Sequence, residues 1–276
     1  MAAWQQLCDR PTGDGGYRSA PRVVDVANRA IETLRYGYVE AMTRDSTKQA
    51  SAEATRQAAV DAMKQAAAEA ALGYVGPGMT IGVGTGSTAA WFVAALARRR
   101  DEIVAAVASS EATAAALRAA GIAVVDLAAV GSVPLYVDGA DEVDRELRLI
   151  KGGGGAHTRE KAVATAADLF VCIVDETKLA KRLGGVPVPV EVLPESAEDV
   201  AERLIALGGT PAARSGLVTD GGNAILDVTG LDLIDPEGLE DAIDAIPGVV
   251  ENGIFARRRA DVVLVGAPEG VRVLQV

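Results

Sequence analysis

Short apolar segments alternate with amphipathic ones in the first half of the chain, and this alternation restricts the possible folds more than any other feature. Met79–Val83 is an apolar segment, the glycine turn Gly84–Ser87 follows it, and Thr88–Arg99 has the periodicity of an amphipathic helix. Strand, glycine turn and helix in that order form the opening unit of a doubly wound α/β domain. The sequence therefore predicts a Rossmann-like, mostly parallel sheet with helices on both faces.

Further segments continue this pattern. A helix is expected over residues 51–72, which are rich in alanine and contain neither glycine nor proline. Ligands of such sheets bind beyond the carboxyl ends of the strands. The turn at residues 84–88 and the acids at residues 138–141 both lie at such ends and are therefore expected to face a ligand. The remaining predictions are strands at 103–108, 123–126, 133–138 and 169–174, and helices at 110–120 and 155–167. The segment DEIVAAV, which includes the start of the strand at 103–108, could instead extend a helix.

A second pattern begins near residue 185. It predicts a strand in PVPVEV, a helix after it, two strands around the turn Asp220–Asn223, and a helix over residues 236–246. We interpret residues 185–256 as a smaller α+β domain of ferredoxin-like type. The last strands, within residues 257–276, are expected to return to the first domain, which otherwise comprises residues 51–184.

Residues 1–50 differ from the rest of the chain. They are polar, contain glycine and proline, and show helical periodicity only over residues 23–42. This composition predicts a disordered extension. We interpret it as dispensable, with Met42 as a plausible start of the natural protein.

Charge and hydropathy exclude several classes of protein. The net charge is −11, and no cluster of lysine and arginine is long enough to indicate a nucleic-acid-binding surface. No apolar run reaches the roughly 18 residues of a membrane helix, and no secretory signal is recognisable. Cys172 lies in an apolar predicted strand and Cys8 in the extension, so a disulfide is not expected. We expect a cytoplasmic protein that binds neither nucleic acid nor membrane.

Four carboxylates lie at or just after the carboxyl end of the predicted strand 133–138. They could be solvated loop residues or calcium ligands, but DGADEVD does not match the pattern of an EF-hand loop. Asp138 and Asp141 are close enough in sequence for a turn to aim both into one cleft, where they could handle the hydroxyl protons of a polyol. We interpret the other two, Glu142 and Asp144, as ordinary loop residues.

Lys151 precedes four consecutive glycines, Gly152 to Gly155, and then a predicted helix. A glycine costs roughly 0.5–1 kcal/mol relative to alanine in regular structure, so this backbone is expected to approach another group closely. Amides at a helix start can stabilise an oxyanion, and Lys151 would add positive charge. Glu160 lies in the same helix, where it could serve such a site or pair with a cation on the surface.

The segment GVGTGST, residues 82–88, resembles the dinucleotide-binding pattern G-x-G-x-x-G, but Ser87 stands at the third glycine position. No acid follows at the end of the next strand, which argues against a nicotinamide-linked dehydrogenase. The loop offers backbone amides at a helix N-terminus and the hydroxyls of Thr85, Ser87 and Thr88. These donors suit a terminal phosphate, although a tight turn without a ligand is an alternative.

Taken together, these segments closely resemble type A ribose-5-phosphate isomerase. The resemblance covers the chain from about Met63 to its end and rests on GVGTGSTA, VDGADEVD, LIKGGGGAHTREK, DETKLAKRLG, PVPVEV, TDGGNAILD and IPGVVENGIF. It implies an enzyme that interconverts ribose 5-phosphate and ribulose 5-phosphate through a cis-enediolate, without metal or cofactor. It further implies the non-oxidative branch of the pentose phosphate pathway, a small pentose phosphate as the partner, and a homodimer or homotetramer.

The resemblance also implies roles for individual residues. Glu160 matches the general base that moves a proton between C1 and C2, and Asp138 matches an acid that handles ring-oxygen or hydroxyl protons. Asp141 and Lys151 match the groups that hold the hydroxyls and stabilise the enediolate. The implied substrate-binding residues are Gly84, Thr85, Gly86, Ser87, Thr88, Gly152, Gly153, Gly154, and the basic residues Lys64 and Lys178.

Two departures and one alternative accompany this interpretation. His157 stands where the family often has an apolar residue, and TDGGN replaces the more usual T-D-N-G-N. Neither is a catalytic position, and we interpret His157 as a helix-start residue beside the site. A sugar-phosphate sensor shares a glycine-turn α/β core, but it would need a DNA-binding arm. Residues 1–56 are nearly neutral and contain no clear helix-turn-helix.

Overall fold

The computed structural model describes residues 51–275. The chain divides into two units, residues 1–56 and 57–276, and only the helical residues 51–56 of the first unit are described. The predicted extension over residues 1–50, with its helical periodicity and Cys8, lies outside the described residues. No helix in the described range is long and apolar enough to cross a membrane.

The second unit contains most of the elements that the sequence predicts. It opens with helical residues 57–71 and the turn η2 (Leu72–Tyr74). Its first half then contains β1 (Thr80–Val83), α2 (Ser87–Leu96), η3 (Ala97–Glu102), β2 (Ala105–Ala108), α3 (Glu111–Ala119), α4 (Leu127–Val130), β3 (Leu135–Asp138), β4 (Glu142–Val143), β5 (Leu149–Ile150), α5 (His157–Thr165), β6 (Phe170–Asp175) and η4 (Glu176–Lys178). Its second half contains β7 (Val188–Val192), η5 (Pro194–Ser196), α6 (Ala197–Ala206), β8 (Thr210–Ala213), β9 (Ala224–Thr229), α7 (Pro236–Asp244), β10 (Val249–Asn252), β11 (Ile254–Phe255), β12 (Val262–Ala267) and β13 (Gly270–Gln275).

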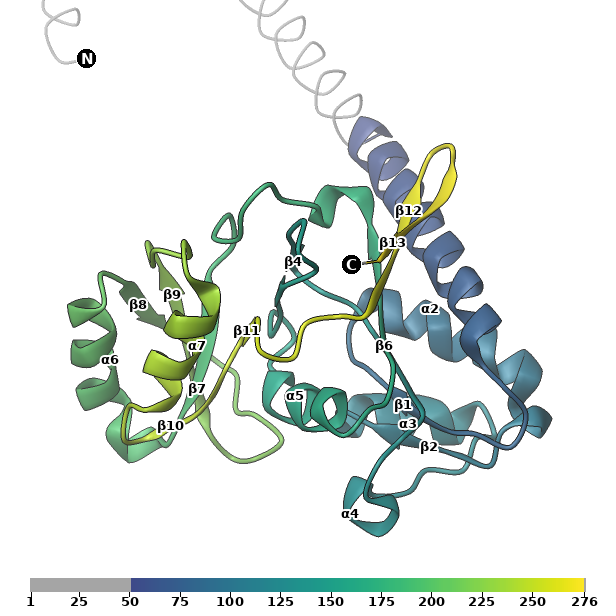
Figure 1. Ribbon diagram of the computed structural model, residues 1–276, viewed down its shortest axis with the longest axis horizontal. Coiled ribbons are helices and arrows are strands. Elements are labelled where there is room, and N and C mark those ends of the chain that lie inside the picture. Colours follow the sequence, from purple (N-terminus) through teal and green to yellow (C-terminus); the bar gives the residue numbers. More distant parts are fainter. Residues whose placement is uncertain (1–50, 276) are drawn as a thin grey trace, which may run out of the picture. The chain divides into compact units, whose positions relative to one another are not determined.

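A six-stranded sheet with the order β13-β12-β6-β3-β1-β2 forms the larger layer (Figure 1). Its strands are parallel except for β13, which pairs antiparallel with β12 at one edge. The chain passes from β1 to β2 on one side and then returns to the other side of β1 as β3. Strand order therefore reverses between β1 and β3, and in such sheets ligands bind in the crevice outside the carboxyl ends at this switch point.

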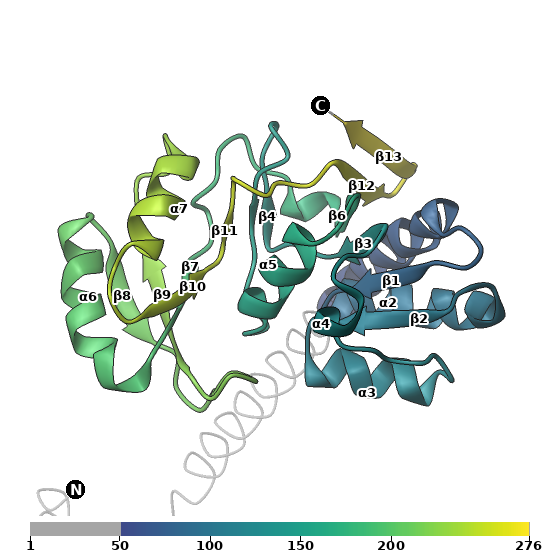
Figure 2. The same ribbon diagram turned by 60° about the horizontal axis from the view of Figure 1, so that its bottom comes forward.

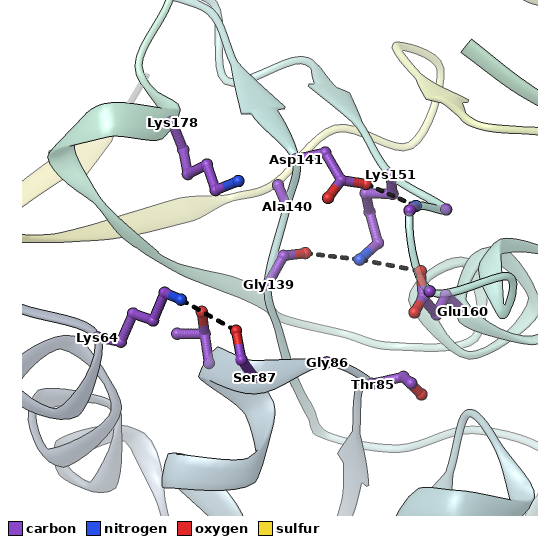
Figure 3. A pocket seen from close by; sticks show the side chains of 14 residues that line it. Lys64, Thr85, Gly86, Ser87, Gly139, Ala140, Asp141, Lys151, Glu160 and Lys178 are labelled. Carbon is purple, nitrogen blue, oxygen red and sulfur yellow. Dashed lines mark hydrogen bonds and ion pairs between the residues drawn. The ribbon is translucent and has the colours of Figure 1, made fainter. Parts of the chain in front are cut away.

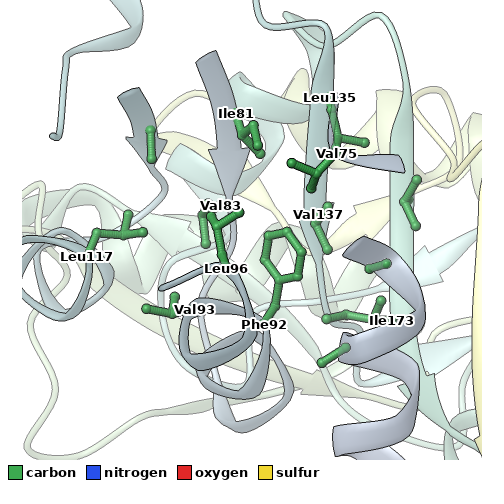
Figure 4. Packing of buried hydrophobic residues seen from close by; sticks show 14 of the residues in the cluster. Val75, Ile81, Val83, Phe92, Val93, Leu96, Leu117, Leu135, Val137 and Ile173 are labelled. Atoms are coloured by element: carbon green, nitrogen blue, oxygen red, sulfur yellow. The ribbon is translucent and has the colours of Figure 1, made fainter. Parts of the chain in front are cut away.

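Both faces of this sheet are covered, as a doubly wound fold requires. Neighbouring residues of a strand point to opposite faces, so Leu135 and Val137 of β3 pack with Phe92 of α2 (Figure 4), whereas Tyr136 packs on the other side with Val163 of α5. The helix over residues 57–71, α2 and α3 cover the first face, and α5 covers the second. The prediction of a Rossmann-like, mostly parallel sheet is confirmed.

The smaller domain is built on a four-stranded antiparallel sheet with the order β10-β7-β9-β8 (Figure 2). Helices α6 and α7 follow the first and third strands in the chain, which is the βαββαβ sequence of a ferredoxin-like domain. Apolar residues of both helices share one hydrophobic core with Val188, Val190 and Val192 of β7. The predicted return of the final strands is also seen, since β12 pairs with β6. The exact domain bounds remain predictions.

A third sheet of strands β11, β5 and β4 was not predicted, although the segment GIF, residues 253–255, which contains β11, is strand-like in sequence. Each of these strands is only two residues long, too short for a periodic signal. The interpretation of Glu142 and Asp144 as ordinary loop residues is wrong, because both are buried. Glu142 accepts hydrogen bonds from the amides of Gly184 and Gly185, and Asp144 accepts from Arg148.

Two local predictions also need correction. Residues 123–126 form one isolated parallel bridge, between Ala106 and Val124, and not a strand, because α4 begins immediately after them. The turn at Asp220–Asn223 does not join the two strands as a tight hairpin. Residues 214–223 connect β8 to β9, and the turn occupies only the end of that loop, where the Gly222 amide donates to the Thr219 carbonyl.

Candidate active site

A cavity of about 110 Å³ opens at the switch point between β1 and β3 (Figure 3). It is lined by the loops after both strands, by the glycine run, and by residues from α5, η4 and the helix over 57–71. Twelve of the fourteen predicted site residues line this cavity. The other two, Asp138 and Gly84, lie behind the lining. Gly139 and Ala140 also line the cavity, although the sequence did not predict them. The lining consists of Lys64, Thr85, Gly86, Ser87, Thr88, Gly139, Ala140, Asp141, Lys151, Gly152, Gly153, Gly154, Glu160 and Lys178.

The loop after β1 is held against the end of β3. A Cβ atom at Gly84 would lie 1.8 Å from Asp138 Oδ1, so only glycine allows this close approach. The Thr85 amide donates to the same oxygen at 3.0 Å. Gly86, with φ of 109°, lets the chain turn into α2, which begins at Ser87. The loop's shape therefore depends on Asp138.

The hydroxyls of this loop divide into two groups. Thr85 Oγ1 lies 2.8 to 3.2 Å from the hydroxyl oxygens of Ser109, Ser110 and Thr113, and this polar cluster braces the loop from behind. Ser87 Oγ instead accepts a hydrogen bond of 3.1 Å from Lys64 Nζ. Ser87 and Thr88, at the N-terminus of α2, are the hydroxyls placed to meet an anion in the cavity.

Lys151 is buried at the centre of a charged network. Its Nζ donates to Asp138 Oδ2 at 2.7 Å and to the Gly139 carbonyl at 2.6 Å, and it lies 3.1 Å from Glu160 Oε2. Burial alone lowers the pKa of Lys151, but attraction by the Asp138 and Glu160 carboxylates outweighs burial and raises it above its ordinary value. The ammonium therefore carries a stable positive charge beside the cavity.

Asp138 has no exposed surface and receives donors on both oxygens. The amides of Thr85 and Gly139 donate to Oδ1, and the Tyr136 hydroxyl and Lys151 donate to Oδ2. Tyr136 is two residues before Asp138, on the same face of β3. The alternation of the strand could have indicated this partner, which the sequence predictions missed.

Glu160 lies one turn into α5, with its side chain 5% exposed beside Lys151. Its Oε2 is within ion-pair distance of Lys151 Nζ, but among the described residues it has no hydrogen-bond donor. Burial first, and then the negative charge of Asp138, raise the pKa of Glu160 to about 8, against the opposing effect of Lys151. A carboxylate without a donor on one oxygen is suited to accept a proton.

The glycine run forms the wall next to Lys151. Gly152 has φ of 105°, and a Cβ atom there would lie 2.7 Å from His157 Nδ1. The Gly153 amide donates to Asp141 Oδ2 at 2.8 Å. His157, the first residue of α5, is fully buried behind this run, outside the cavity lining, and burial lowers its pKa to about 4. An imidazole with that pKa is neutral at physiological pH.

The cavity has two chemically different ends. Lys64 and Lys178 point into it from one side, and Lys151 and Glu160 lie at the other (Figure 3). The first end combines two ammonium groups with the N-terminus of α2, and the second combines a base, a cation and backbone amides. Among the described residues, no group of three or more His, Cys, Asp and Glu side chains is arranged to hold a metal ion.

Comparisons with known proteins agree on one family. The family model described as ribose 5-phosphate isomerase A (phosphoriboisomerase A) matches residues 105–270. A ribose-5-phosphate isomerase A from Acidithiobacillus ferrooxidans is 57% identical over 202 residues, which cover 73% of this chain and 92% of the relative. One from Legionella pneumophila is 55% identical over 206 residues, covering 75% and 95%.

Solved structures give the same result. The ribose 5 phosphate isomerase A from Neisseria gonorrhoeae superposes with a TM-score of 0.77 at 46% identity and covers 78% of this chain and 97% of its own. A D-ribose-5-phosphate isomerase in complex with phospho-erythronic acid gives a TM-score of 0.76 at 39% identity, with coverage of 79% and 99%. Sequence and fold thus lead to one family through independent comparisons.

Proposed function

We propose that this chain, which belongs to the ribose 5-phosphate isomerase A family, interconverts D-ribose 5-phosphate and D-ribulose 5-phosphate through a cis-enediolate. Family membership makes the protein an isomerase and confirms the resemblance found in the sequence. The observation that carries the proposal is that one pocket combines the buried Glu160 carboxylate, the buried Lys151 ammonium and the backbone of the glycine run. At its other end the same pocket has hydroxyl and ammonium donors that suit a phosphate group.

The chemistry explains why these groups belong together. A proton on a carbon next to a carbonyl is weakly acidic, so its removal needs a placed base and stabilisation of the oxyanion that forms. In the proposed reaction Glu160 takes the proton from C2 of the aldose and returns it to C1. A hydroxyl proton moves from O2 to O1, which completes the ketose. Atoms balance without any second reactant.

Lys151 and the glycine amides are proposed to stabilise the enediolate. The ammonium is already buried, so it need not be desolvated when substrate enters, and charge interactions are stronger in a site that excludes water. Asp141 is the carboxylate in the lining that can hold sugar hydroxyls. Asp138 lies behind the lining, and we propose that it acts on ring-oxygen and hydroxyl protons indirectly, by orienting the Lys151 ammonium that donates to those oxygens.

The phosphate is proposed to bind at the opposite end of the pocket. Ser87 and Thr88 would donate from the start of α2, while Lys64 and Lys178 would supply positive charge. A substrate anchored there presents its first two carbons to the other end. The wider proposal retains a place in the non-oxidative pentose phosphate pathway, a cytoplasmic homodimer or homotetramer, and no cofactor.

The purified protein is expected to form ketose from ribose 5-phosphate in the presence of EDTA and without added cofactor. Ketose formation can be followed by absorbance or by proton NMR, with heat-inactivated protein as the control. Nicotinamide cofactors should neither be needed nor consumed. Absence of ketose formation under these conditions, by protein with an intact melting transition, would reject the isomerase assignment in favour of a sugar-phosphate sensor.

The value of kcat/KM is expected to rise with pH and to level off above about 8. Burial and the charge of Asp138 raise the pKa of Glu160 to about 8, and only the ionised carboxylate can accept the C2 proton. A rise near pH 6 could come from the substrate phosphate, whose second pKa is about 6. Asp138→Asn removes a charge that raises the pKa of Glu160, so the midpoint should move to lower pH. An unchanged midpoint in this variant would contradict the assignment.

A further inference from the structure

Arg214 contacts the wall of the pocket from outside. It lies in the loop between β8 and β9 of the smaller domain and is not part of the lining. Its Nη1 donates to the carbonyl oxygen of Gly152 at 2.9 Å and to that of Gly153 at 3.2 Å. A side chain from the smaller domain thus holds two consecutive peptide groups of the glycine run, residues 152–155, which belongs to the larger domain.

The guanidinium is itself held in place by Asp227 of β9. Nε of Arg214 donates to Asp227 Oδ2 at 2.8 Å, and Nη2 donates to Oδ1. The Arg214 side chain is only 17% exposed. A bidentate pair of this kind fixes the plane of the guanidinium and leaves Nη1 free to face the carbonyls.

The position of these carbonyls determines where the neighbouring amides point. In a planar trans peptide, the C=O of one residue and the N–H of the next lie on opposite sides of the chain. With the Gly152 carbonyl directed at Arg214, the Gly153 amide must point away from it, and it donates to Asp141. The same reasoning directs the Gly154 amide away from Arg214, on the side where Gly154 lines the cavity.

Two contacts besides Arg214 limit the glycine run: the Gly155 amide donates to the Gly152 carbonyl at 3.0 Å, and the Gly153 amide donates to Asp141. Arg214 adds a constraint on the carbonyls of both Gly152 and Gly153. A run of four glycines has more backbone freedom than any other tetrapeptide, so its peptide groups can rotate unless something holds them. The Gly153 amide already donates to Asp141, so the Gly154 amide is the one that can face an oxyanion. It can stabilise the oxyanion only while the peptide groups keep their orientation.

We propose that Arg214, held by Asp227, is a positioning residue for the reaction: it orients the Gly152–Gly154 peptides so that their amides face Asp141 and the developing oxyanion. The inference rests on the proposed isomerase activity. Among the residues that line the pocket, Arg214 donates hydrogen bonds only to the carbonyls of Gly152 and Gly153, so it acts through the glycine backbone. The smaller domain thereby contributes to catalysis without lining the cavity.

The test compares Arg214→Met with Arg257→Met. Arg257 forms the same kind of bidentate pair with Asp241 of α7, and within residues 51–275 it forms no hydrogen bond with the glycine run. We expect Arg214→Met to lower kcat about ten- to a hundredfold, the range that a misplaced catalytic group can cause. KM for ribose 5-phosphate should change by less than about threefold. Arg257→Met should retain the activity of the unaltered protein.

Binding measurements separate positioning from a general structural effect. Phospho-erythronic acid has a carboxylate where the enediolate would carry its negative charge, whereas inorganic phosphate can use only the phosphate end. In Arg214→Met, the affinity for phospho-erythronic acid should fall by about the same factor as kcat/KM, and the affinity for phosphate should stay unchanged. Equal weakening of both ligands, or kcat equal to that of Arg257→Met, would overturn the proposal.

Two further variants keep the inference testable if Arg214→Met folds poorly. Arg214→Lys can reach one carbonyl but cannot form the bidentate pair, and Asp227→Asn weakens that pair while leaving Arg214 present. Both should give kcat values between those of Arg214→Met and the unaltered protein. Full activity in both would also refute the proposal. Inactivity of the unaltered protein would instead reject the isomerase function, so the two failures are distinguishable.

Discussion

Glu160→Gln is expected to lower kcat by about 10³- to 10⁴-fold while leaving substrate binding nearly unchanged. A general base contributes a factor of up to about 10⁴, and glutamine keeps the size of the side chain but cannot accept the C2 proton. Lys151 keeps its contacts with Asp138 and Gly139, so the pocket should keep its shape. The measurements are kcat for ketose formation and the affinity for phospho-erythronic acid.

Hydrogen exchange at the substrate tests the role of Glu160 directly. In D2O the unaltered protein should introduce deuterium at C2 of ribose 5-phosphate, and Glu160→Gln should not, as followed by proton NMR. Glu142→Gln is a matched control, because Glu142 is also a buried glutamate but binds the amides of Gly184 and Gly185 outside the pocket. Near-normal kcat in Glu160→Gln would show that another group is the base.

Lys151→Met is expected to reduce both activity and stability. It removes the charge proposed to stabilise the enediolate, and loss of one such electrostatic group commonly lowers kcat about 10²- to 10³-fold. It also leaves Asp138 and Glu160 buried without their shared cation. Breaking a buried ion pair by removing one partner costs about 3–5 kcal/mol of unfolding free energy.

The stability loss in Lys151→Met should grow above about pH 8. The pKa of Glu160 is already raised from 4.5 to about 8, and removal of Lys151 would raise it further. Between about pH 5 and pH 8 both folded proteins keep this proton while their unfolded chains release it, so both lose stability alike. Above about pH 8 the unaltered folded protein releases the proton and the folded variant keeps it, so only the variant continues to lose stability. Urea unfolding of both proteins at about pH 7 and about pH 9.5 measures the difference.

A double variant tells whether the stability loss comes from the two buried carboxylates. Lys151→Met combined with Glu160→Gln removes one of them, so it should be more stable than Lys151→Met alone at pH 8 and equally inactive. If the double variant were no more stable, the loss would come from packing around Phe255, whose ring centroid lies 5.5 Å from Lys151 Nζ. Thermal melting of both variants at pH 8 decides between these explanations.

The sequence predicted the larger sheet well because its signals are local. The apolar run of β6 and the glycine turn before α2 can be recognised from the few residues that form them. The alternation of such strands with helices leaves few possible topologies. The three-stranded sheet was not predicted, because its two-residue strands exist only through pairing between distant segments, such as Ile254 with Ile150. Local periodicity contains no information about such contacts.

The site residues, like the strands, were predicted where the signal is local and missed where it depends on contacts made by folding. The residues of the glycine turn, the acids and the glycine run were found because each motif is contiguous and each ends a strand or starts a helix. The partners that hold them were missed. Tyr136 was hidden in an apolar strand, and Arg214 lies 62 positions from the carbonyl it binds. The contact of Arg214 with Gly152 arises from the packing of the two domains, and the sequence near either residue contains no pattern that predicts it.

The position of β12 has a consequence for synthesis of the chain. This strand lies between β6 and β13, although the whole smaller domain separates it from β6 in the sequence. Until the ribosome has made residues 262–267, β6 is an unpaired edge of fully buried, mostly apolar residues, the kind of edge that pairs with other chains. Gly266 then lets β12 approach the helix over residues 57–71, where a Cβ atom would lie 1.9 Å from the Met63 carbonyl oxygen. Newly made chains should therefore be most prone to aggregation just before their last strands emerge.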